Sequence, residues 1–263
     1  MTTFLERILE TKHAEVERLL ASGRPDAAQL AELPPTRGFA KHLSDNERLS
    51  VIAEVKQASP SKGLITTDFR PVETACTYAE GGARAISVLT DETYFRGSLD
   101  DLKNIRRAVG VPVLRKDFII HEAQIDEARA AGADAILLIV AALRRDRLIS
   151  LSKYAQGLGL DVLVEIHGLD ELDSALAASP SVLGVNNRDL RTFEVSLETT
   201  EKVAEAMPPG LPFIAESGVH TAADAARLAA CGACGILVGE SLMRCESPQA
   251  RANLLSDLQV LRP

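Results

Sequence analysis

The sequence predicts a (β/α)8 barrel, and three observations indicate it. Short runs of branched apolar residues alternate with helix-length segments, which is typical of successive βα units. A helix-to-strand junction with an Ala-rich helix, a terminal glycine and an apolar strand recurs at Ala79 to Ile86, Ala130 to Ile136 and Ala230 to Ile236. The length of 263 residues suits one barrel of this kind, which needs ~250 residues.

The apolar runs number eight and are apolar on both faces, as expected of a parallel sheet covered on both sides. They lie at 51–56, 84–89, 112–116, 134–139, 160–165, 182–186, 212–216 and 235–239. Helical segments separate most of them, for example at Leu99 to Val109, Glu122 to Ala131 and Thr221 to Ala230. An open doubly wound sheet would need a Gly-rich first turn, but the first turn reads QASPSKG from Gln57 to Gly63.

We expect one domain over 1–263, with 1–50 as an N-terminal helical extension. The extension carries a helical apolar stripe that ends in a Pro-broken stretch through Pro25, Pro34 and Pro35. The stripe consists of Phe4, Leu5, Ile8, Leu9, Val16, Leu19 and Leu20. This segment is too small for a separate domain, so we expect an added helix that caps one end of the barrel.

Composition excludes several classes of function. The formal charge of −8 argues against nucleic acid as the main partner. The longest apolar run, Ala135 to Leu143, is far shorter than the roughly 20 residues that a membrane helix needs, and the N-terminus lacks the pattern of a signal peptide. We therefore expect no membrane association and a cytoplasmic location. Cys231 and Cys234 form a C-x-x-C without a second ligand pair, so we predict no metal.

Polar side chains end the predicted strands at what would be one edge of the barrel. They are Glu54, Lys56, Lys116, Glu165, Asn186 and Glu216, with Arg188 just beyond. Active sites of such barrels lie at this edge, and burying unpaired charges is costly, so the set predicts a site. Glu54 and Lys56 alone could equally be a buried structural ion pair.

Two turns are suited to phosphate. Ser217 and Gly218 follow the seventh strand, and Gly239 and Glu240 follow the eighth. Phosphate sites in these barrels commonly use these two turns and a short helix N-terminus. Each glycine alone could simply mark a tight turn.

The run from Ile52 to Gly63 (IAEVKQASPSKG) resembles the signature of the indole-3-glycerol-phosphate synthase family. The resemblance continues in the same order over nearly the whole chain: SVLTD at 87–91, LRKDFI at 114–119, LVEIH at 163–167, GVNNRDL at 184–190, AESG at 215–218 and VGESLM at 238–243. Thr66-Thr67-Asp68 and His121-Glu122 depart from the family pattern, at positions with no expected chemistry.

The resemblance implies ring closure, decarboxylation and dehydration of 1-(2-carboxyphenylamino)-1-deoxy-D-ribulose 5-phosphate, a phosphorylated anthranilate derivative. It implies Lys116 as the acid for ring closure, Glu165 as the base or acid of dehydration, and Lys56 with Glu54 as the second cationic participant. Substrate contacts are expected from Ser59, Phe95, Phe118, Asn186, Arg188, Glu216, Ser217, Gly218, Gly239 and Glu240.

No cofactor is implied, because the substrate's own iminium character serves as the electron sink. The loop from Gln57 to Ile65, with Gly63 as its hinge, is expected to close over the substrate. We expect a monomer that can associate with other enzymes of the tryptophan pathway.

Three alternatives remain open. A Schiff-base aldolase on the same architecture would use Lys116 as an amine nucleophile. The phosphoribosylanthranilate isomerase barrel binds a similar ligand but would not be expected to carry the first-strand motif. A non-catalytic barrel that binds a phosphorylated ligand would most simply have lost acid–base residues, which are all present here.

Overall fold

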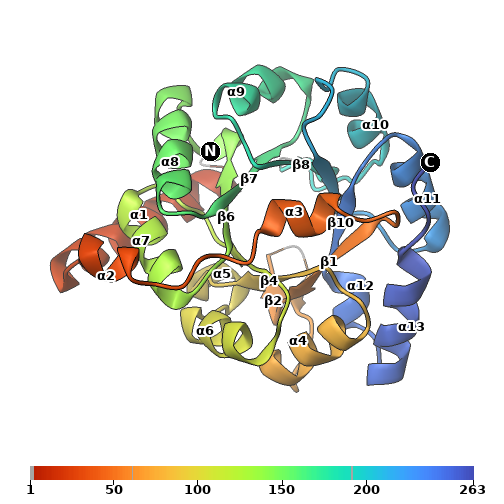
Figure 1. The fold of residues 1–263 in the computed structure, drawn as a ribbon, viewed down its shortest axis with the longest axis horizontal. Coiled ribbons are helices and arrows are strands. Elements are labelled where there is room, and N and C mark those ends of the chain that lie inside the picture. The colour runs from red at the N-terminus through yellow and green to blue at the C-terminus, as the bar shows by residue number, and fades with distance from the viewer. Residues whose placement is uncertain (1–2, 61, 191) are drawn as a thin grey trace.

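The computed structural model describes residues 3–60, 62–190 and 192–263. Eight parallel strands close into a barrel in the order β1-β10-β9-β8-β7-β6-β5-β4, with helices around it (Figure 1). The predicted (β/α)8 barrel is therefore confirmed, and every predicted strand boundary lies within one residue of the observed one. The strands are β1 (Ser50–Val55), β4 (Ala85–Leu89), β5 (Val113–Lys116), β6 (Ala135–Ile139), β7 (Asp161–Ile166), β8 (Val182–Asn186), β9 (Phe213–Glu216) and β10 (Gly235–Val238).

Helices follow the strands and cover the outside of the barrel. The longer ones are α4 (Pro71–Glu80), α6 (Leu99–Ala108), α7 (Glu122–Ala131), α8 (Arg145–Gly157), α9 (Leu172–Ala177), α10 (Glu198–Ala204), α11 (Ala222–Ala230) and α13 (Pro248–Leu258). Short helical turns lie in the connections: α5 (Glu92–Phe95), η1 (Val140–Ala142), η2 (Leu169–Glu171) and α12 (Glu240–Met243).

Helix α7 illustrates how local sequence sets these boundaries. The His121 side chain accepts the N–H of Ala123, and Gln124 completes a capping box at the start of the helix. Gly132 ends the helix at φ 89°, a left-handed conformation that glycine adopts without a Cβ penalty. His121 and Glu122, which depart from the family pattern, therefore both have structural contacts. His121 caps α7, and Glu122 forms an ion pair with Arg147 of α8.

The barrel interior is layered because side chains alternate along each strand. Ile52, Leu114, Leu163 and Ile214 form a fully buried apolar layer inside the barrel. Two residues further along the same strands come Glu54, Lys116, Glu165 and Glu216. The outward residues pack against the helices in a separate core, so the polar layer lies at the carboxyl ends of the strands.

The N-terminal extension contains α1 (Phe4–Ser22), α2 (Ala27–Ala31) and α3 (Phe39–Ser44). Phe39 and Leu43 of α3 are fully buried and belong to the apolar cluster inside the barrel, and α3 crosses in front of the barrel in Figure 1. The first turns of α1 instead line a cavity at the opposite, carboxyl end. The sequence analysis expected one added helix at one end, whereas the extension reaches both ends.

The connection after β1 holds a small hairpin, in which β2 (Ala58–Ser59) pairs with β3 (Gly63–Leu64). Sequence analysis treated 57–65 as a loop; Gly63 has φ 65° there, and Ser61 lies outside the described residues. Among the residues that the structure describes, no helix has the length and apolar character needed to cross a membrane.

Candidate active site

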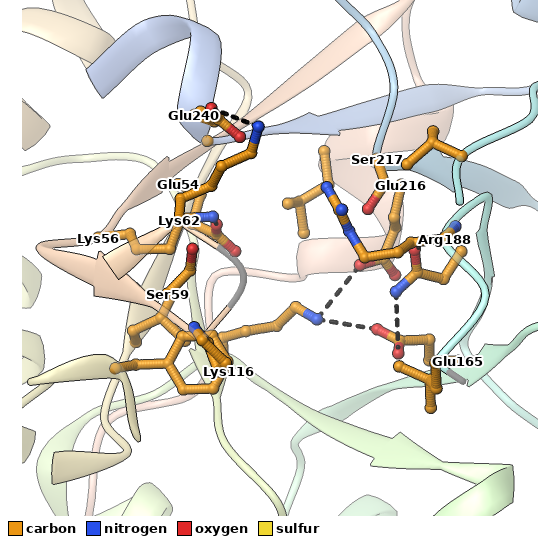
Figure 2. A pocket seen from close by; sticks show the side chains of 18 of the residues that line it. Glu54, Lys56, Ser59, Lys62, Lys116, Glu165, Arg188, Glu216, Ser217 and Glu240 are labelled. Carbon is orange, nitrogen blue, oxygen red and sulfur yellow. Dashed lines mark hydrogen bonds and ion pairs between the residues drawn. The ribbon is translucent and has the colours of Figure 1, made fainter. Parts of the chain in front are cut away.

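A cavity of about 460 Å³ opens at the carboxyl ends of the barrel strands. All fourteen site residues predicted from the sequence line it: Glu54, Lys56, Ser59, Phe95, Lys116, Phe118, Glu165, Asn186, Arg188, Glu216, Ser217, Gly218, Gly239 and Glu240. Figure 2 shows Lys116 and Glu165 reaching toward each other across this cavity. The strand ends thus bring together side chains that are up to 186 positions apart in the chain, from Glu54 to Glu240.

Lys116 is the central cation of the cavity. Its Nζ lies 2.8 Å from Glu165 Oε2 and 3.3 Å from Glu216 Oε2. Burial lowers the pKa of Lys116, but Glu165, Glu216 and Glu54 outweigh it and raise the pKa above its ordinary value. Lys116 is therefore a charged ammonium at neutral pH, as a proton donor must be.

Glu165 and Glu216 share this ammonium but differ in their surroundings. Burial raises the pKa of Glu165, yet Lys116 and His167 outweigh it and lower the pKa below its ordinary value. Burial raises the pKa of Glu216 despite Lys116, and the charge on Glu165 raises it further. The pKa values of the two carboxyl groups are thus shifted in opposite directions, which is a common arrangement for separate acid and base roles.

Glu216 occupies space that a glycine leaves open. Gly184 lies on β8, the strand next to β9, and a Cβ on Gly184 would collide with Glu216 Oε1. That oxygen is buried and has no hydrogen-bond partner among the described residues. A buried polar oxygen without a partner is costly, so a ligand hydroxyl, which can donate or accept, is a fitting partner for it.

The second lysine, Lys56, forms an ion pair with Glu54, with Nζ 2.5 Å from Oε1. A Cβ on Gly239 would collide with Glu54 Oε1 and approach Lys56 Nζ to 3.1 Å. The glycine of the eighth turn therefore makes room for this pair, in addition to any contact of its own backbone with a ligand.

The two turns after β9 and β10 lie side by side at the cavity. Ser217 and Gly218 are both left-handed, with φ 67° and 83°, and a Cβ on Gly218 would lie 2.6 Å from Val195. Gly239 directly precedes α12, and its backbone carbonyl oxygen accepts a hydrogen bond from the N–H of Met243. Backbone N–H groups of such turns and a serine hydroxyl suit an anion.

Glu240 would repel an anion, but two cations lie against it. Its carboxylate lies 3.0 Å from Arg244 Nε and 3.7 Å from Lys62 Nζ. Figure 2 shows this contact between Lys62, on the connection after β1, and Glu240. Lys62 was not among the predicted site residues, although it lies in the motif from Ile52 to Gly63.

Apolar side chains form the other wall of the cavity. The rings of Phe95 and Phe118 lie 6.2 Å apart, centroid to centroid. Phe4, Leu5 and Ile8 of α1 complete the wall and were not predicted to take part in the site. The apolar stripe of this helix was predicted, but the spacing of its residues does not show which surface of the barrel the stripe packs against.

Three further polar residues that support the site were also missed. Lys12 of α1 is buried against carboxylates behind the aromatic wall, and His167 contacts Glu165. Asn187 donates its side-chain N–H to the carbonyl oxygen of Ser217 and so holds the turn after β9. Only His167 and Asn187 lay in motifs that the sequence analysis had selected.

The fold and the cavity define a (β/α)8 barrel with an acid–base site, two lysines and three carboxylates, at the carboxyl ends of its strands. A family model described as indole-3-glycerol phosphate synthase matches residues 5–255. The chain therefore belongs to the indole-3-glycerol phosphate synthase family, whose members are decarboxylating carbon–carbon lyases of tryptophan biosynthesis.

Relatives with this name agree over nearly their whole length. The chain is 49% identical to the one from Desulfotalea psychrophila over 246 residues, which cover 93% of this chain and 95% of the relative. It is 50% identical to the one from Exiguobacterium sibiricum, with 93% of each covered. Identity to the one from Azospirillum brasilense is 48%, with 97% and 99% covered.

Solved structures with low identity share the fold. An N-acetylmannosamine-6-phosphate 2-epimerase from Clostridium perfringens aligns with a TM-score of 0.62 at 17% identity, over 82% of this chain and 96% of the other. A thiamine phosphate pyrophosphorylase from Pyrococcus furiosus aligns with a TM-score of 0.59 at 19% identity, over 80% and 96%.

Proposed function

We propose that this chain converts 1-(2-carboxyphenylamino)-1-deoxy-D-ribulose 5-phosphate to indole-3-glycerol phosphate, carbon dioxide and water. One observation carries the proposal most directly. An ammonium, Lys116, lies between two carboxyl groups whose pKa values are shifted in opposite directions, Glu165 and Glu216, in a cavity that has an apolar wall and a rim of two turns suited to an anion. The substrate has matching parts: a ketone, an aromatic ring, two hydroxyls and two anionic ends.

Ring closure is the step assigned to Lys116. The aryl carbon that bears the carboxylate attacks the ketone, whose oxygen gains negative charge and needs a proton. The Lys116 ammonium supplies it, and loss of carbon dioxide then restores the aromatic ring. The electrons left by the carboxylate return to the substrate's own iminium nitrogen, so the step needs no cofactor.

Dehydration is the step assigned to Glu165 and Lys56. The hydroxyl leaves as water with one proton from Lys56, while Glu165 removes a proton from the neighbouring ring carbon. Glu165 Oε2 is 2.8 Å from Lys116 Nζ, so the proton it takes can return to Lys116. Lys116 and Lys56 each donate one proton, and Glu165 recovers one. Each turnover therefore takes up one proton from solvent, which restores Lys56.

The remaining residues of the cavity are assigned to binding. Ser59, Asn186, Arg188 and Glu216 hold the hydroxyls and the carboxylate. Ser217, Gly218, Gly239 and Glu240 hold the phosphate, the last two through backbone N–H groups. Phe95 and Phe118 contact the aromatic ring.

Indole fluorescence tests the proposal. Purified, metal-free protein mixed with the carboxyphenylamino-deoxyribulose phosphate should produce the fluorescence of an indole together with one equivalent of carbon dioxide. Absence of both products from folded protein would refute the assignment.

The surroundings of Lys116 disfavour the Schiff-base aldolase. A lysine nucleophile must lose its proton, which burial or a neighbouring cation promotes by lowering its pKa. The carboxylates around Lys116 raise its pKa instead. Borohydride added during turnover should therefore trap no adduct on Lys116, whereas an aldolase would be labelled there.

We also propose that the chain acts as a monomer in the cytoplasm and can associate with other enzymes of its pathway. The large exposed apolar side chains among the described residues are scattered over different elements, for example Leu20, Ile149 and Leu261. The four cysteines are all free, as is usual in a reducing compartment. Light scattering on a sizing column should give the mass of one chain, 28.2 kDa.

A further inference from the structure

His167, which directly follows β7, is held between two carboxylates. Its Nε2 lies 3.3 Å from Glu165 Oε1, and its Nδ1 lies 3.5 Å from Glu171 Oε2. The side chain is 11% exposed, and it is not among the residues that line the cavity. Its contact with Glu165, which does line the cavity, links it to the site.

Glu171 fixes the position of the histidine. The carboxylate of Glu171, at the end of η2, accepts the backbone N–H of His167 at 2.7 Å and also faces its ring. Backbone and ring are thus held by the same carboxylate, which leaves Nε2 directed at Glu165. Neither ring nitrogen makes a well-aligned hydrogen bond within the described part of the chain, so both contacts are ion pairs.

These two carboxylates keep the imidazole charged. Burial lowers the pKa of His167, but Glu165 and Glu171 outweigh it and raise the pKa to about 10. Among the residues that the structure describes, the other polar groups in contact with Glu165 are Lys116 from β5, Asn186 from β8 and Glu216 from β9. Of these, only Lys116 is a cation.

Lys116 contacts both carboxyl groups and lies closer to Glu165, at 2.8 Å, than to Glu216, at 3.3 Å. Two carboxylates that share one site do not both ionise readily. His167 and the amide of Asn186 add to this asymmetry, since both contact Glu165; of the two, only the histidine can bring a positive charge.

We propose that His167 is a positioning residue that keeps Glu165 the ionised member of the pair and so leaves the proton on Glu216. Glu165 can then act as a base, and Glu216 can donate its proton in a hydrogen bond to the substrate. This inference rests on the proposed role of Glu165, so the activity of Glu165→Gln is measured first.

The test is the pH profile of kcat/KM for the wild type and for His167→Asn. Removing the cation beside Glu165 should raise the pKa of that carboxyl, so the acid limb should move to higher pH by about one unit. Activity should then recover at higher pH. His13→Asn, which removes an exposed histidine of α1, is the matched control and should leave the profile unchanged.

A second measurement does not depend on folding of the His167 variant. Ring NMR of the wild type should show one of the five histidines as an imidazolium at pH 8, and Glu165→Gln should lower its pKa. A neutral His167 at pH 7, or an acid limb that stays in place in folded His167→Asn, would overturn the inference. Full turnover by Glu165→Gln would instead refute the proposed role of Glu165.

Discussion

The ammonium of Lys12 lies 2.8 Å from the carboxylate of Asp117, the residue that follows Lys116 in the chain. The same ammonium contacts Asp91 and Glu15 at 2.8 Å each, and its side chain is 1% exposed. Asp91 accepts the backbone N–H of Phe95, and Asp117 accepts that of Phe118. One cation of the N-terminal extension therefore joins the two turns that carry the aromatic wall of the cavity.

Lys12→Met should destabilise the protein and weaken substrate binding. Removing one member of a buried ion pair leaves uncompensated charge, at a cost of about 3–5 kcal/mol in the free energy of unfolding. Loosening of α1 and of both aromatic turns should raise KM. Urea unfolding and initial rates measure the two effects.

Lys103→Met is the matched control, because Lys103 pairs with Asp100 on the surface. Exposed pairs contribute about 0–1 kcal/mol, so this variant should resemble the wild type in both measurements. Equal behaviour of the two methionine variants would contradict the role given to Lys12.

The same cluster predicts a pH dependence of stability. Burial raises the pKa of Asp117, but Arg115 and Lys12 outweigh it and lower the pKa from 3.8 to about 2. A carboxyl group whose pKa is lowered by folding stabilises the fold at any pH above its unfolded pKa. This contribution is lost as the pH falls through the pKa of the folded state. The free energy of unfolding should therefore fall between pH 3.8 and about 2.

Lys12→Met should lose less stability over that acid range, because Asp117 no longer has its lysine partner. The difference between wild type and variant should shrink as the pH falls from about 5 to about 2.5. Urea titrations at both pH values measure it, and a constant difference would argue that Asp117 is not the group responsible.

Gly184→Ala should reduce turnover with little loss of stability. The added Cβ would collide with Glu216 Oε1 and lie 3.2 Å from Leu163 Cδ1, so the Glu216 carboxyl group must shift from the position in which it contacts Lys116. Gly110→Ala, where no atom lies within 4 Å of the added Cβ, is the control. Steady-state kinetics should show a lower kcat in the first variant alone; a normal kcat there would show that the placement of Glu216 is unimportant.

Ser217→Asp tests the position of the phosphate. A carboxylate at this turn should repel the substrate phosphate and raise KM more than it lowers the free energy of unfolding. Ser256→Asp adds the same charge at an exposed position of α13 and should leave KM unchanged. If both variants have the KM of the wild type, the phosphate binds elsewhere.

Local pattern was enough to predict the barrel and the polar layer at its carboxyl edge. Glu54, Lys116, Glu165 and Glu216 could be placed together because each ends an apolar run, and parallel strands present these ends at one edge. Their assignment to individual chemical steps came from the family resemblance, because spacing along the chain does not encode which carboxyl group is ionised.

Lys12 shows the limit of this kind of inference. It lies on a helix whose apolar stripe predicts burial, but a lysine there is normally assumed to extend to solvent. Two of its three carboxylate partners, Asp91 and Asp117, are more than 75 positions away and become its neighbours only when α1 docks on the barrel. Such long-range contacts follow from tertiary packing, and the residues near Lys12 in the sequence do not predict them.

The central claim, that Lys116 and Glu165 serve successive steps, is tested most directly by measuring carbon dioxide and indole separately in a single turnover. Lys116→Met should slow the release of both products by at least ~10²-fold, the usual scale for a positioned acid or base. Glu165→Gln should slow indole formation by a similar factor while carbon dioxide is still released ahead of it. Wild-type rates for both products in either folded variant would contradict the account.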